Sequence, residues 1–136
     1  MALEIEQSER EGVVTLRLTG RITVGPEVSA LREKVAELSS AGSLNLVLDL
    51  AALDYIDSTG LGALVLCATN VRKGGGNMKL VNLNRRHIEL LVMTKLTTVF
   101  ETYADIQDAV NSFFPDRKIS SFDILEFVHR MKDEDE

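Results

Sequence analysis

Residues 44–62, LNLVLDLAALDYIDSTGLG, join an alternating apolar segment to a turn of small and polar residues. Leucine stands at every second position of the first seven residues, which predicts a strand with one well-buried face. The turn, DSTGLG at 57–62, brings together a carboxylate, two hydroxyls and two glycines. Asp57 or Ser58 is suited to cap a helix there, because a short polar side chain can accept a hydrogen bond from the first helical turn.

The segment that follows the turn has the periodicity of a helix. Its apolar residues recur at spacings of three and four and comprise Leu61, Leu64, Val65, Ala68 and Val71. Arg72 and Lys73 suit the last turn of this helix, and three glycines at 74–76 mark its end. Cys67 is the only cysteine, so the chain has no internal disulfide, and we interpret it as part of the core.

Upstream and downstream segments continue an alternation of strands and helices. Two short alternating segments at 3–7 and 12–19 predict a hairpin, and a helix is expected from Pro26 to about Gly42. In the second strand of the hairpin, polar residues alternate with apolar ones, which predicts one face in contact with solvent. Further elements are expected at 77–83 (strand), 85–95 (helix), 99–100 (short strand) and 105–113 (helix).

This order predicts an α/β fold with a mixed sheet of four to five strands. The N-terminal hairpin supplies an antiparallel pair, and right-handed crossovers between the later strands place the helices mainly on one face. We expect one domain at 1–113 and a C-terminal extension at 114–136.

The extension, which begins where Pro115 interrupts the pattern, predicts one more helix. Ser120 and Asp123 have the spacing of a capping box. The apolar stripe that follows consists of Ile124, Phe127, Val128 and Met131. We expect this stripe to pack on the protein's own surface, while a homodimer or capture of a partner through it stays open; the acidic end at 132–136 is interpreted as frayed.

Composition excludes several classes of protein. The chain has 136 residues and a net charge of −6, which disfavours nucleic-acid binding because that depends on neutralising phosphates. Its N-terminus, MALEIEQSER, is acidic where a secretory signal would be basic. No apolar stretch approaches the roughly 20 residues that cross a bilayer. The expectation is a cytoplasmic protein that binds neither nucleic acid nor membrane.

Enzymatic interpretations of DSTGLG are weak. The glycines lack the Lys and Ser or Thr of a phosphate-binding loop, and the G-x-S-x-G pattern of a nucleophilic serine is absent. A serine nucleophile also needs a base, and we interpret both His87 and His129 as surface residues. We therefore predict no enzyme activity, no cofactor and no metal.

The turn and its surroundings resemble the STAS domain of bacterial anti-sigma factor antagonists. The resemblance rests on LDLAALDYIDSTGLGALV, on GVVTLRLTGRI before it and on MKLVNLNRRHIELLVMTKLTTVFETYADIQDAV after it. It implies that Ser58 is phosphorylated by an anti-sigma factor that is a serine kinase, with Thr59 as the alternative acceptor, and that a separate serine phosphatase removes the phosphate. It also implies that the unphosphorylated protein sequesters the anti-sigma factor.

The residues expected to bind the partner surround the turn. They are Arg21, Thr23, Asp57, Ser58, Thr59, Gly60, Leu61 and Gly62. Arg21 and Thr23 occupy positions where the family commonly has acidic residues, which leaves the identity of the kinase open. We expect Asp57 to hold the turn through backbone hydrogen bonds, and Leu61 to pack beneath it. The alternative is a STAS scaffold or a subunit of a transport complex that binds partners without phosphorylation.

Overall fold

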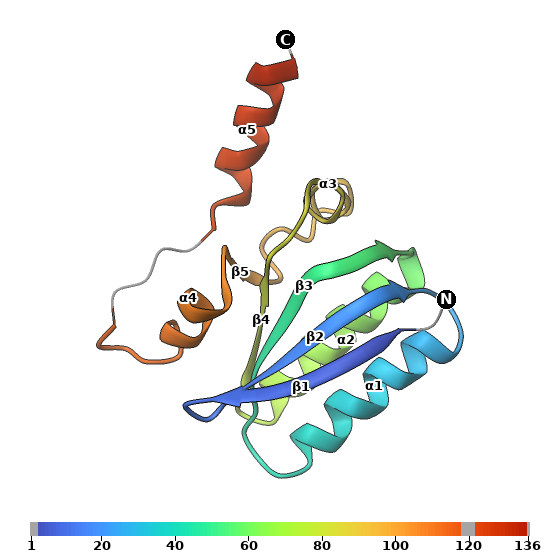
Figure 1. Ribbon diagram of the computed structural model, residues 1–136, viewed down its shortest axis with the longest axis vertical. Coiled ribbons are helices and arrows are strands. Elements are labelled where there is room, and N and C mark those ends of the chain that lie inside the picture. The colour runs from blue at the N-terminus through green and yellow to red at the C-terminus, as the bar shows by residue number, and fades with distance from the viewer. Residues whose placement is uncertain (1–2, 118–121, 136) are drawn as a thin grey trace.

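The computed structural model describes residues 3–117 and 122–135, which form a five-stranded sheet with helices around it (Figure 1). The strands are β1 (Glu4–Arg10), β2 (Val13–Ile22), β3 (Asn45–Ile56), β4 (Asn77–Val81) and β5 (Glu101–Tyr103). The helices are α1 (Pro26–Ser39), α2 (Ser58–Lys73), α3 (Arg85–Met93), α4 (Ile106–Asn111) and α5 (Ile124–Asp135). The sheet order is β1-β2-β3-β4-β5, so the mixed α/β fold expected from the sequence is confirmed.

The hairpin between β1 and β2 has a tighter turn than the sequence predicted. The strands pair antiparallel up to Arg10 and Val13, which leaves Glu11 and Gly12 as a two-residue loop. Both loop residues have positive φ, 53° and 81°, as a type I′ turn requires. The backbone of a type I′ turn matches the right-handed twist of the two strands, so two residues are enough to connect them.

The remaining strands are parallel and are joined by helices. β2 pairs with β3, β3 with β4, and β4 with β5, all in parallel. Because right-handed crossovers that all advance in one direction place their helices on the same side, α1, α2 and α3 share one face. The main core lies between these helices and the sheet, where Leu16, Leu48 and Leu80 have at most 1% exposed surface.

The opposite face of the sheet is covered in part by α4, and this differs from the expectation for the central strand. A second cluster of buried residues forms there from Val13, Val47, Val81, Tyr103, Ala109 and Val110. Asp49 is also buried on β3 and accepts hydrogen bonds from the Ala51 N–H and the Asn82 amide at 3.0 and 2.9 Å. Residues 46–50 of β3 are therefore buried on both faces, because the chain crosses to the other side of the sheet after β5.

The edge strand lies two residues later than predicted. Val99 and Phe100 precede β5, and Phe100 is buried in the main core without being part of the strand. The pairing of Lys79 with Glu101 sets the register of β5 on β4. The apolar pair Val99 and Phe100 had indicated a strand, but both residues lie in the loop before β5, and Phe100 contributes to the core from there.

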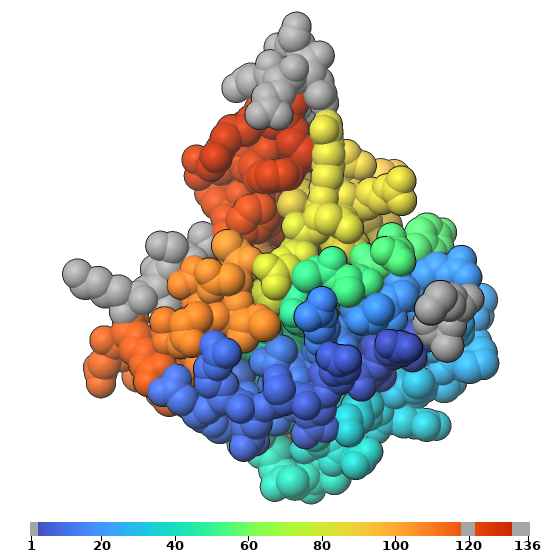
Figure 2. Space-filling view, in the orientation of Figure 1, coloured from blue at the N-terminus to red at the C-terminus, as the bar shows by residue number. Residues whose placement is uncertain are grey.

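The C-terminal helix α5 rests on the rest of the protein at its beginning and projects beyond the sheet (Figures 1 and 2). Thr102 accepts a backbone hydrogen bond from Phe122 at 3.0 Å, and Ile124 is buried. Phe127 and Val128 are partly buried against the main core, so the predicted packing of the stripe on the protein's own surface is seen at these positions. The Asp123 carboxylate accepts from the Glu126 N–H at 3.1 Å, while the expected partner in a capping box, Ser120, lies outside the described residues.

Candidate functional site

Ser58 is the first residue of α2 and its side chain is exposed. The strand before it, β3, runs to Ile56, so only Asp57 separates the end of the strand from the start of the helix. This short connection follows from the sequence, in which an extended apolar segment meets a helix cap directly. The hydroxyl is thereby presented at the positive end of the helix dipole.

Asp57 joins two parts of the chain at this point. One carboxylate oxygen accepts from the Gly60 N–H at 2.7 Å and caps α2, while the other accepts from the Val24 N–H at 2.9 Å. The Asp57 N–H in turn donates to the carbonyl of Ile22 at 3.2 Å. The hydrogen bonds from Gly60 and Val24 hold the pKa of Asp57 below its usual value, because they stabilise the carboxylate. The predicted role of Asp57 in holding the turn agrees with this geometry.

The two glycines of the turn have different environments. Gly60 is buried, and a Cβ on it would collide with the carbonyl oxygen of Ile22. Gly62 is exposed, and a Cβ there would have no atom within 4 Å. Leu61 is 4% exposed and packs in the main core beneath the turn. Gly60 and Leu61 are thus buried under the turn, whereas Ser58, Thr59 and Gly62 are exposed at its surface.

Arg21 lies near the end of β2 beside the turn, and Thr23 follows directly after the strand. The register pairs Arg21 with Tyr55 and Ile22 with Ile56, which brings the end of β2 next to the residues that precede Ser58. Arg21 is exposed and Thr23 is half-buried. Because Ile22 packs into the main core under α2, alternation along the strand directs Arg21 toward the other face of the sheet.

Three exposed apolar residues were missed by the sequence analysis, two beside the turn and one farther along α2. Val24 is 69% exposed in the loop after β2, Tyr55 is 51% exposed near the end of β3, and Leu66 is 49% exposed two turns into α2. Val24 and Tyr55 lie beside the turn, whereas Leu66 is about 12 Å along the helix from Ser58. Val24 and Tyr55 do not belong to the apolar periodicities from which the core was predicted. An apolar residue outside such a periodicity is the signal that could have identified them as exposed.

The prediction that His87 is a surface residue is wrong. Its side chain is 4% exposed, its Nδ1 accepts from the Asn84 N–H at 3.1 Å, and its Nε2 lies 2.9 Å from the carbonyl of Leu53. Since Nδ1 accepts a hydrogen bond, the proton is on Nε2 and is donated to Leu53. Burial lowers the pKa of His87. Asn84 also caps α3 at the His87 N–H, so the pair forms a capping box in which histidine takes the place usual for Glu or Gln.

His87 therefore has both ring nitrogens engaged in holding α3 and is not poised to activate Ser58. The other histidine, His129, is exposed on α5. Cys67 is buried, as expected, and burial raises the pKa of its thiol to about 11. Among the side chains described, no group of three or more His, Cys, Asp or Glu residues is arranged to hold a metal ion.

The fold and the site define a known class of domain. The STAS domain family matches residues 4–109, which extend from β1 into α4. The chain belongs to the STAS domain family. No helix in the described part of the chain combines the length and apolar character needed to span a bilayer.

Within this family the chain is similar to anti-sigma factor antagonists, as the sequence predicted. It is 33% identical over 110 residues to the anti-sigma-B factor antagonist of Bacillus subtilis (strain 168), covering 81% of this chain and 99% of that protein. A candidate anti-sigma factor antagonist from Thermotoga maritima superposes with a TM-score of 0.73 at 23% identity, covering 79% of this chain and 92% of that one.

The anti-sigma factor antagonist SpoIIAA, a Bacillus cell fate determinant, shares the fold in two forms. Its unphosphorylated form gives a TM-score of 0.69 at 19% identity, covering 86% of this chain and 100% of that one. Its phosphorylated form gives a TM-score of 0.63 at 18% identity, covering 82% and 99%.

Proposed function

We propose that this protein is an anti-sigma factor antagonist that binds an anti-sigma factor kinase until that kinase phosphorylates Ser58. The observation that carries the proposal is the exposed Ser58 hydroxyl at the first position of α2, held by the Asp57 cap. The similarity to the anti-sigma-B factor antagonist supports it. A serine phosphatase would reverse the modification, and Thr59, which is also exposed, is the alternative acceptor.

Phosphorylation at this position is compatible with the fold. A phosphoryl group adds about −1.5 to −2 charge and three acceptor oxygens. At a helix N-terminus this charge meets the positive end of the dipole, which contributes about 0.3–1 kcal/mol in favour of the modified state. Because Ser58 projects into solvent, the group requires no rearrangement of the core.

The phosphate is therefore expected to lower the affinity of the protein for the kinase. A dianion that is buried against a partner without a cation loses its water at a cost of several kcal/mol. For a complex of micromolar affinity, near −8 kcal/mol, a loss of about 4 kcal/mol weakens binding roughly a thousandfold. That is sufficient for a switch between bound and free states without a change of fold.

The proposed binding surface consists of two kinds of residue. Ser58, Thr59, Gly62 and Arg21 are exposed and offer direct contact, with Thr23 half-buried beside them. Asp57, Gly60 and Leu61 act on the partner by fixing the shape of the turn. Arg21 places a cation at the rim of the site, which favours a kinase whose contacting surface there is neutral or acidic.

A protein that acts by binding a transcription regulator needs no cofactor and no catalytic residues of its own, and it works in the cytoplasm.

The α5 helix has Leu125 61% exposed, and a homodimer through that helix would bury it. Light scattering of the full chain at micromolar concentration distinguishes such a dimer from a monomer.

Mass measurement after incubation with ATP tests the switch. The parent and its Ser58→Ala variant are incubated with each anti-sigma kinase of the source organism. We expect a gain of one phosphate in the parent and none in the variant, with Thr59→Ala behaving like the parent. The absence of phosphate with every kinase would favour the alternative, a STAS scaffold or transport-complex subunit that binds partners without a phosphorylation switch.

A further inference from the structure

We propose that the kinase contacts more than the turn: its interface continues along α2 into the groove between α1 and α2, where Arg32 pairs with an acidic side chain of the kinase and Leu66 packs against an apolar one. The inference rests on the proposed function and specifies the chemistry of the partner. It follows from the shape, continuity and charge of this groove.

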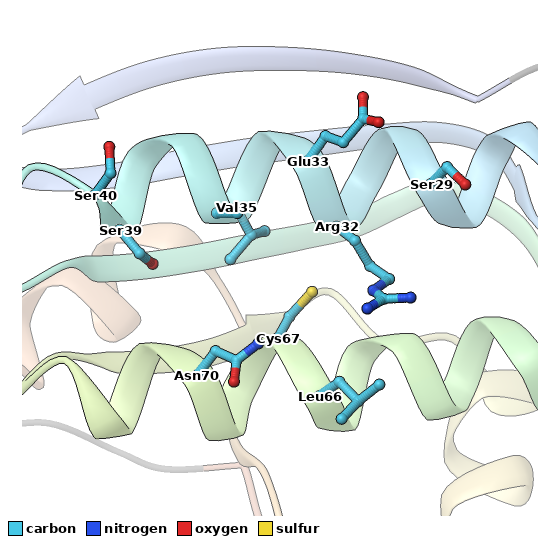
Figure 3. A pocket seen from close by; sticks show the side chains of 10 residues that line it. Ser29, Arg32, Glu33, Val35, Ser39, Ser40, Leu66, Cys67 and Asn70 are labelled. Carbon is cyan, nitrogen blue, oxygen red and sulfur yellow. The ribbon is translucent and has the colours of Figure 1, made fainter.

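The groove has a volume of about 550 Å³ and lies between the two helices (Figure 3). Arg32, Val35 and Ser39 point from α1 toward α2, and Cys67 and Asn70 point from α2 toward α1, as Figure 3 shows. Val35 and Cys67 are buried and make an apolar floor, while the arginine, the serine and the amide supply polar groups around it. A mixed lining of this kind suits side chains of a protein partner.

An exposed stripe of α2 connects the groove to Ser58. The exposed residues of this helix include Thr59, Gly62, Leu66 and Asn70. Their spacings of three and four place them on one side of the helix. Leu66 and Asn70 line the groove, so a partner that covers Ser58 and follows this stripe for roughly 12 Å reaches it.

Several polar side chains of the groove lack partners among the described residues, although the Ser40 hydroxyl donates to the carbonyl of Glu37. Arg32 is exposed and, among the described residues, neither its guanidinium nor the side-chain amide of Asn70 has a hydrogen bond or ion pair. The Ser39 hydroxyl oxygen is buried without a hydrogen-bond partner. Because Arg32 and Asn70 are exposed, a binding partner can reach the guanidinium and the amide without a change in the fold.

These features favour an acidic side chain as the occupant. A carboxylate accepts hydrogen bonds from a guanidinium and an amide, which Arg32 and Asn70 supply, while the Glu33 carboxylate at the edge of the groove points away from α2 (Figure 3). Leu66, which is 49% exposed at the rim, offers an apolar contact next to them. A small organic anion would satisfy the donors but would leave Leu66 and the stripe uncovered, so we assign the groove to the kinase.

Binding of the full chain to its phosphorylating kinase, measured by calorimetry without ATP, tests the inference. The variants are Arg32→Glu, Leu66→Asp and the control Arg17→Glu. Arg17 is exposed on β2 between two residues of the main core, so it lies on the sheet face away from α1 and α2. We expect Arg32→Glu and Leu66→Asp each to weaken binding about tenfold or more, which corresponds to 1.4 kcal/mol, and Arg17→Glu to bind like the parent.

Two outcomes contradict the inference and leave the proposed function intact. Parent-like binding by both groove variants would show that the kinase does not use the groove. An equal loss in Arg17→Glu and Arg32→Glu would show a response to net charge alone. If no kinase binds or phosphorylates the parent chain, the proposed function itself fails, and the groove loses its assigned occupant with it.

Discussion

Asp57 accepts a hydrogen bond from the backbone N–H of Val24 at 2.9 Å, although the two residues are 33 positions apart. The same carboxylate caps α2 through Gly60. One side chain thus fixes both the start of the helix that carries Ser58 and the loop that leads from β2 to α1. This carboxylate therefore fixes the position of the exposed Ser58 hydroxyl relative to the exposed Val24 side chain.

Removal of this carboxylate is expected to destabilise the protein more than removal of an ordinary cap. We expect Asp57→Ala to lower the free energy of unfolding by about 2 kcal/mol, the upper end of the range for N-caps, because the Val24 hydrogen bond is lost as well. Asp105→Ala is the matched control, since Asp105 caps α4 through one hydrogen bond from the Asp108 N–H. Urea denaturation measures both; equal losses would mean that the Val24 contact contributes nothing.

The two glycines of the turn are expected to respond in opposite ways. Gly60→Ala should destabilise the fold by about 1–3 kcal/mol, because its Cβ would overlap the Ile22 carbonyl. Gly62→Ala should leave stability unchanged or raise it by about 0.5–1 kcal/mol, since the site is open and helical. Thermal and urea unfolding check the pair, and a stable Gly60→Ala variant would contradict the close approach of α2 to β2.

Phosphorylation of Ser58 is expected to change binding and not folding. The free energy of unfolding of the phosphorylated chain should lie within about 1 kcal/mol of the parent, with a shift toward higher stability at low salt, because the helix dipole favours the added charge. Urea denaturation of both forms at two salt concentrations measures this. A loss of several kcal/mol would indicate that the phosphate disrupts the core.

His87 is expected to make stability depend on pH below 6.5. Its pKa is lowered in the folded protein, so between that value and the ordinary 6.5 the unfolded chain binds more protons than the folded one. The free energy of unfolding is therefore fully retained above pH 6.5 and decreases as the pH falls below it. Protonation would place a hydrogen on Nδ1, which now accepts from Asn84.

Urea denaturation at pH 7.5, 6.5 and 5.5 tests this dependence. The control is His87→Gln, because glutamine can complete a capping box and does not titrate. The parent should lose stability across this range, while the variant, although less stable at pH 7.5 through loss of the Leu53 contact, should show a flatter profile. Parallel profiles for the two proteins would rule out His87 as the titrating group.

Much of the fold could be predicted because its signals are local. The alternation in β3, the stripe of α2 and the polar turn between them lie within 30 residues, and each reflects the geometry of a single element. The cap at Asp57 and the burial of Leu61 were predicted for the same reason. The similarity of the turn to STAS domains could be recognised from contiguous residues alone.

Other features depended on contacts between distant segments. The sequence around His87 predicts the polar start of a helix, but the Leu53 carbonyl of β3 accepts a hydrogen bond from its Nε2. Val47 and Asp49 alternate with the leucines of β3 as if exposed, yet α4 returns 60 residues later to cover the end of the sheet where they lie. Phe100 looked like part of a strand and is instead a core residue of the preceding loop.

The amino-acid sequence by itself determined the order of the elements, the helix cap and the presence of hydroxyls at the turn, because periodicity and capping act over a few residues. Only the tertiary structure decided which side chains surround that turn and which polar groups of the α1–α2 groove are left without partners. Strand register and helix packing bring together residues that are far apart in sequence, and no local pattern contains that information.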